Sequence, residues 1–111
     1  MKIIYNSFIP FKGFSAMMLC GVIFARREHR PLSATTINHE AIHRAQARDC
    51  GGYLWFYLRY LWFWLRGLVK YRFDNKKAYH SIPFEREAYA YEYRLEYITT
   101  CRQTNAWKNF V

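Results

Sequence analysis

The stretch ATTINHEAIHRAQARD, residues 34–49, decides the fold of this chain. Ser33 and the threonines that follow it offer side-chain oxygens that can cap the free N–H groups of a helix's first turn. Gly51 and Gly52 come next, in the positions where helices commonly end. We therefore predict a helix that runs to about Asp49, the best delimited element of the sequence.

This predicted helix contains the motif His39-Glu40-Ala41-Ile42-His43, which has the form HExxH. Residues four apart on a helix differ by about 40° in direction and about 6 Å along the axis. The two imidazoles can therefore bind one ion, while Glu40 points toward the edge of the same pocket. Two nitrogen ligands on adjacent turns suit tetrahedral zinc. With four histidines in the chain, a chance match to this motif is expected in roughly one such sequence in a hundred.

Two histidines need a third protein ligand, with a fourth position left for water in a catalytic site. The candidates are His29, His80 and the acidic cluster of residues 85–96. No histidine lies six residues after His43, so the extended HExxHxxGxxH pattern is absent. A carboxylate from the acidic cluster is therefore the stronger candidate.

HExxH followed by Glu-x-x-Ala on a second helix resembles the gluzincin class of zinc metallopeptidases, in the minimal single-domain form called minigluzincins. The second motif here is residues 85–88, Glu-Arg-Glu-Ala. The resemblance implies that His39, His43 and Glu85 bind zinc. It also implies that a zinc-activated water attacks a peptide carbonyl, with Glu40 as the general base.

Two positions near the second motif leave alternatives open. Glu87 is an alternative ligand to Glu85. Many relatives place an aspartate directly after the alanine, where it orients a ligand histidine, but this chain has Tyr89, which supplies a hydroxyl group and no charge. The alternative function is a catalytically inactive descendant that keeps the zinc and binds a membrane surface or another protein.

The remaining elements complete a small α+β fold. Short β-type runs at residues 2–5 and 21–27 predict an N-terminal sheet, and Pro83 begins a helix expected to extend from Phe84 to about Arg102. Residues 72–81 are expected to form a polar connection. The resemblance implies a single zincin-like domain over residues 1–111, with the sheet packed against about three helices. The strand at 21–27 is expected either to be an edge strand that pairs with substrate or to be an ordinary core strand.

The last nine residues, 103–111, carry Trp107 and Phe110 and are expected to be tied to the domain.

Residues 53–70, YLWFYLRYLWFWLRGLVK, predict a helix that is apolar almost all the way around. Arg59, Arg66 and Lys70 form its one narrow cationic stripe. The helix is too short and too charged for a membrane span, whereas tryptophan, tyrosine and arginine together are typical of a helix that lies in the membrane interface. We expect a membrane surface or a second copy of the chain to cover it.

The chain carries a net charge of +9, which favours anionic partners. Nucleic acid is the less favoured partner, because the cations are dispersed and no nucleic-acid-binding motif is present. The apolar run at residues 14–25 is followed by Arg26 and Arg27 rather than by small residues, so it does not suit a signal peptide. We expect a cytoplasmic protein that can associate with the inner face of the membrane.

Overall fold

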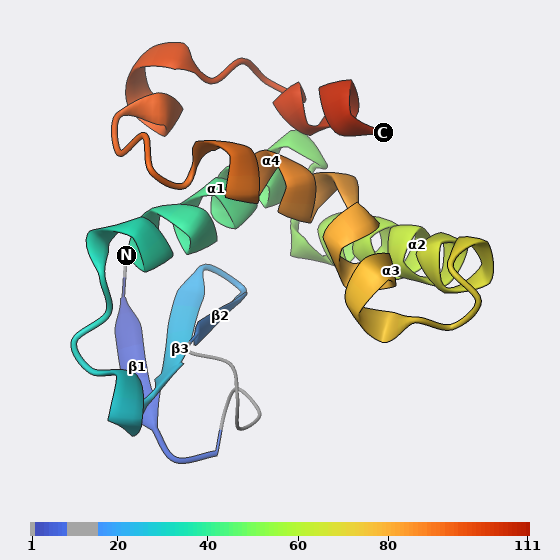
Figure 1. Cartoon of the computed structure of the whole chain (residues 1–111). Helices are drawn as coiled ribbons and strands as arrows, with labels where there is room; N and C mark the ends of the chain where they lie inside the picture. The colour runs from blue at the N-terminus through green and yellow to red at the C-terminus, as the bar shows by residue number, and fades with distance from the viewer. Residues whose placement is uncertain (1, 9–15) are drawn as a thin grey trace.

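A computed structural model describes residues 2–8 and 16–111 of the chain and confirms the α+β class (Figure 1). A three-stranded sheet is built from the N-terminal part of the chain, and helices make up most of the rest. The strands are β1 (Ile3–Asn6), β2 (Ala16–Leu19) and β3 (Val22–Arg26). The α-helices are α1 (Ala34–Asp49), α2 (Tyr53–Lys70), α3 (Asn75–Ser81) and α4 (Pro83–Tyr91). Short 3-10 segments lie at Arg27–His29 and Ala106–Phe110, and a π-helical turn lies at Tyr97–Cys101.

The sheet has the order β1-β3-β2, with β3 parallel to β1 and antiparallel to β2. Of the two alternatives for the strand at 21–27, the core strand is therefore confirmed and the edge strand is wrong, because β3 is the central strand. Strand β2 was not predicted from its sequence, AMML, which lacks β-branched residues. It forms because Cys20 and Gly21 both adopt positive φ angles, 50° and 86°, and reverse the chain so that β2 pairs with β3.

The helix that contains HExxH lies where the sequence predicts. Ser33 caps α1 by accepting a hydrogen bond from the Thr36 N–H at 3.1 Å. At the other end Gly51 has a φ of 88°, and the Gly52 N–H donates to the Ala47 carbonyl at 2.9 Å. Helix α2 also has its expected bounds. Among the described residues, none of the helices is both long enough and apolar enough to cross a bilayer.

Two expectations about the C-terminal half are wrong. Residues 75–81 form α3 rather than an irregular connection, because the Asp74 side chain accepts from the Lys77 N–H at 3.1 Å and caps a helical turn. Helix α4 ends at Tyr91 rather than near Arg102. The reason is Asn38 on α1, whose side-chain amide donates to the carbonyls of Tyr91, Glu92 and Arg94 at 3.3, 2.9 and 3.2 Å. The carbonyls of Tyr91 and Arg94 also accept from the N–H groups of Arg94 and Tyr97, three residues on, so the backbone continues in turns that Asn38 holds rather than in a further stretch of α-helix.

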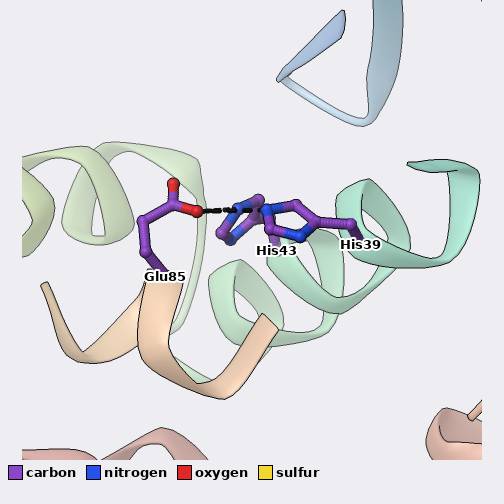
Figure 2. A group of neighbouring side chains, drawn as sticks. All are labelled: His39, His43 and Glu85. Atoms are coloured by element: carbon purple, nitrogen blue, oxygen red, sulfur yellow. Dashed lines mark hydrogen bonds and ion pairs between the residues drawn. The ribbon is translucent and has the colours of Figure 1, made fainter. Parts of the chain in front are cut away.

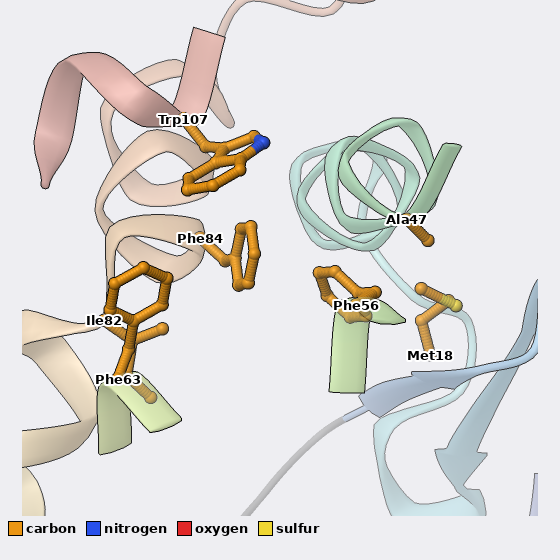
Figure 3. Packing of buried hydrophobic residues seen from close by; sticks show 7 residues of the cluster. All are labelled: Met18, Ala47, Phe56, Phe63, Ile82, Phe84 and Trp107. Carbon is orange, nitrogen blue, oxygen red and sulfur yellow. The ribbon is translucent and has the colours of Figure 1, made fainter. Parts of the chain in front are cut away.

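Helix α1 lies between the sheet and α4, and the largest hydrophobic cluster joins these layers to α2 (Figures 1 and 3). Phe84 of α4 is completely buried. Its ring centroid lies 4.7 Å from that of Phe56 and 4.8 Å from that of Trp107. Trp107 is only 5% exposed, which confirms that the C-terminal residues are tied to the domain. This packing holds the first turn of α4 against α1 and therefore places Glu85, the next residue, at the α1 surface.

Candidate metal centre

Three buried side chains converge between α1 and α4, as Figure 2 shows. The Nε2 atoms of His39 and His43 lie 3.1 and 3.2 Å from the same oxygen, Oε1 of Glu85. One ligand atom from each residue lies within 4.8 Å of the other two, and the three residues are between 4% and 6% exposed. This cluster of two imidazoles and one carboxylate can hold a metal ion.

The convergence follows from the local structure of both helices. His39 and His43 are one turn apart on α1 and therefore share a face. Glu85 lies in the first turn of α4, which begins at Pro83. The Gln46 side chain donates to the Phe84 carbonyl at 2.8 Å and so joins the start of α4 directly to α1. Glu85 is thus positioned by this hydrogen bond as well as by the packing of Phe84.

Gln46 also determines which nitrogen of His43 is available to a metal. Its amide nitrogen donates to the Phe84 carbonyl and to Glu87 Oε1, the latter at 2.9 Å, so its carbonyl oxygen is the atom that faces His43. That oxygen lies 2.8 Å from His43 Nδ1 and can only accept, so Nδ1 carries a proton. Nε2 is then the atom of His43 that can bind a metal, and it is the atom that faces Glu85.

His39 is oriented in the same way by a carboxylate. Its Nδ1 lies 3.0 Å from Glu92 Oε2, which accepts a hydrogen bond from Nδ1–H and leaves Nε2 directed at Glu85. The position directly after Ala88, where an aspartate was the expectation for this charge, holds Tyr89, whose ring packs edge-on against His39 with the ring centroids 4.6 Å apart. The signal that identifies Glu92 is its spacing, since it is the C-cap residue of α4, seven residues after Glu85, and seven residues are close to two helical turns.

The second oxygen of Glu85 is bound by a tyrosine. Tyr60 of α2 donates its hydroxyl to Glu85 Oε2 at 2.8 Å. Burial, together with the neighbouring Glu85 carboxylate, raises the pKa of Tyr60 well above its usual value, so its hydroxyl stays protonated as a donor. Sequence reasoning did not identify Tyr60, because nothing in the sequence distinguishes it from the other nine tyrosines.

The electrostatics of the cluster favour a cation. Burial by itself would lower the pKa of His43, but the charge of Glu85 and its hydrogen bond outweigh burial and raise that pKa to about 9. Burial would likewise raise the pKa of Glu85, yet the charge of His43 and the hydrogen bonds from both histidines hold it far below its usual value. A positive charge shared between His43 and Glu85 is therefore stabilised, whether a proton or a metal ion supplies it.

Glu40 is 7% exposed and lies on α1 beside β2. Burial raises the pKa of its carboxyl group, while the two histidines and a hydrogen bond with the Met18 backbone act in the opposite direction. A carboxylate with a raised pKa is better suited to accept and release a proton near neutral pH.

Glu87, the alternative ligand, lies outside the cluster. It is fully buried and accepts hydrogen bonds from Gln46, from the Tyr97 hydroxyl at 2.7 Å and from Arg102 Nε at 2.8 Å. Arg102 also forms an ion pair with Asp49, the last residue of α1. We call Asp49, Glu87 and Arg102 the Arg102 network. Its Glu87 carboxylate accepts from the Gln46 amide and so holds the Gln46 side chain in place.

The other histidines considered as ligands lie elsewhere. His80 is exposed at the end of α3, with its ring 5.1 Å from Tyr79 and 5.3 Å from Tyr89. His29 is exposed in the 3-10 segment that follows β3. Tyr91 stacks on Tyr97, with ring centroids 4.0 Å apart.

Comparison of the chain with known protein families, with curated proteins and with solved structures found no match.

Proposed function

We propose that this protein is a zinc-dependent peptidase of the gluzincin type, with His39, His43 and Glu85 as the zinc ligands. One observation carries the proposal. Two imidazole Nε2 atoms face one carboxylate oxygen, and a separate acceptor holds each Nδ1. Two neutral imidazoles and one carboxylate, with a fourth position for water, are a donor set typical of catalytic zinc.

Zinc, when bound, polarises a peptide carbonyl and lowers the pKa of water toward about 7. Glu40 then accepts a proton from the attacking water and passes it to the leaving amine. Its position next to ligand His39 and its raised pKa both support this role. Tyr60 keeps Glu85 oriented through the hydrogen bond to Oε2.

Strand β2 is the proposed binding site for an extended substrate. Within the described residues its only strand partner is β3, and its other edge can pair with a peptide through backbone hydrogen bonds. The Met18 backbone on β2 hydrogen-bonds with Glu40, so this strand lies next to the proposed general base. Backbone pairing would bind many sequences, because it does not depend on particular substrate side chains.

A second candidate is a catalytically inactive protein that keeps the zinc for structure. The observation that favours it is the burial of the centre, since the three ligands and Glu40 are all less than 8% exposed. Structural zinc sites are closed to solvent, whereas catalytic sites keep an open position.

Metal analysis and one substitution test the proposal. The purified chain, reconstituted with zinc, should hold about one zinc per chain. Glu40→Gln should abolish hydrolysis of a peptide library while the zinc content stays at the wild-type level, and Glu96→Gln, at an exposed site, is the matched control. Failure to bind zinc would refute the proposal. Wild-type protein that holds zinc and cleaves nothing would favour the inactive alternative.

A further inference from the structure

The outer face of α2 is a continuous apolar surface. Six of its large apolar residues are between 44% and 66% exposed: Leu54, Trp55, Leu58, Leu61, Trp62 and Leu65. At 100° per residue they cover an arc of about 120°, from Leu61 at one border to Trp55 at the other. The opposite side of the helix, with Phe56, Phe63 and Gly67, is buried in the domain. We call the exposed arc the α2 apolar face.

Cations line only one border of the α2 apolar face. Three exposed cations continue around the helix beyond Trp55: Arg66 at about 20°, Arg59 at about 40° and Lys70 at about 60°. Within residues 2–8 and 16–111, no carboxylate forms an ion pair with any of the three. Residues 53–70 contain no acidic side chain at all.

We propose that the α2 apolar face binds the surface of a bilayer that contains anionic lipids, with the helix parallel to the surface. Leucine and tryptophan side chains would enter the boundary between headgroups and acyl chains, and the bordering cations would reach the lipid phosphates. The helix has 18 residues and is about 27 Å long, so it can contact the bilayer surface along this length without crossing the bilayer. The net charge of +9 attracts the whole chain to such a surface.

Charge complementarity favours a bilayer over a second copy of the chain. In a two-fold pair with antiparallel α2 helices, both cation rows would lie along the same border and repel each other. In a parallel pair, each row would face the other border of the partner helix, where Tyr57, Trp64 and Leu68 lie. Neither pairing offers a carboxylate from α2 to the cations, whereas anionic headgroups supply negative charge along the whole row.

Vesicle binding tests this proposal and does not depend on peptidase activity. The zinc-loaded full chain is mixed with vesicles of phosphatidylcholine alone or with added phosphatidylglycerol, and sedimentation measures the bound fraction. We expect at least tenfold stronger binding to the anionic vesicles. Leu61→Glu should weaken it by about tenfold or more, because a carboxylate replaces an inserted apolar side chain. Leu95→Glu is the matched control, since Leu61 and Leu95 are exposed leucines, at 49% and 56%.

The cation row is tested in the same assay. Arg59→Gln should weaken binding to anionic vesicles by about fivefold, and Lys76→Gln on α3 should change it by less than twofold. Circular dichroism and zinc content show that each variant is folded. The proposal is overturned if wild type does not bind the anionic vesicles, or if Leu61→Glu and Leu95→Glu bind equally. It is also overturned if light scattering shows a dimer in solution that Leu61→Glu dissociates, because a second copy then covers the face.

Discussion

Replacement of Gln46 by methionine tests the positioning of the centre most directly. Methionine is similar in size to glutamine and favours helices, but it offers His43 Nδ1 no strong acceptor and offers the Phe84 carbonyl no donor. Loss of the group that orients a ligand histidine typically weakens metal binding by about 10- to 100-fold, or about 1.4–2.8 kcal/mol. Loss of the hydrogen bond to the Phe84 carbonyl should separately cost about 0.5–1.5 kcal/mol of unfolding free energy. Glu87 keeps its hydrogen bonds to Arg102 and Tyr97.

Two measurements separate these effects. Competition with a chromophoric chelator gives the zinc affinity, and urea denaturation of the metal-free protein gives the unfolding free energy. Gln103→Met, at an exposed position, is the matched control and should change neither value appreciably. Gln46→Glu keeps an acceptor for His43 but faces Glu87 with a like charge, so it should lose stability and keep most of the zinc affinity. A folded Gln46→Met variant with wild-type zinc affinity would refute the proposed orientation of His43.

Three further outcomes follow from the structure. Arg102→Met should lower the unfolding free energy by about 3–5 kcal/mol in urea denaturation, because the buried carboxylates of Asp49 and Glu87 lose their ion-pair partner. The control Arg94→Met, at an exposed position, should change the unfolding free energy by less than about 0.5 kcal/mol. The pKa of His43 is raised to about 9, so zinc must displace a proton from this side chain when it binds. Calorimetry in several buffers should therefore detect proton release, and the zinc affinity should rise by up to about tenfold per pH unit from pH 7 to pH 9. Zinc binding without proton release would contradict this. Gly67→Ala should lower the denaturation midpoint although alanine favours helices, because the added Cβ would lie 2.6 Å from Ser81 Oγ. A variant more stable than wild type would contradict this and would show that α2 and α3 can move apart to accept the methyl group.

The elements that depend on local signals can be predicted from the sequence. The bounds of α1 follow from a capping serine and two glycines, and those of α2 from an uninterrupted apolar pattern. The HExxH spacing alone places His39 and His43 on one helical face, and the structure brings them together with Glu85. These features need only a few neighbouring residues to be specified, because caps, turns and helical periodicity act over one or two turns.

Strand β2 and the end of α4 were missed because they depend on contacts outside their own residues, whereas α3 was missed although its cap, Asp74, lies directly before it. Strand β2 has little β propensity and exists because β3 pairs with it. The pattern of residues 84–102 allows a long helix, but Asn38, more than fifty positions earlier, binds the carbonyls where α4 ends. Local propensity cannot show either effect, since both arise when tertiary contacts outweigh it.

The sequence by itself therefore determined that two histidines share one face of a well-capped helix and that a second helix is apolar almost all the way around. Only the tertiary structure decided what surrounds those histidines. Glu85 rather than Glu87 faces them, while Gln46 and Glu92 hold their other nitrogens. The physical reason is distance along the chain. His39 and Glu85 are 46 positions apart, so their contact depends on how the hydrophobic core packs α4 against α1 and not on any local pattern.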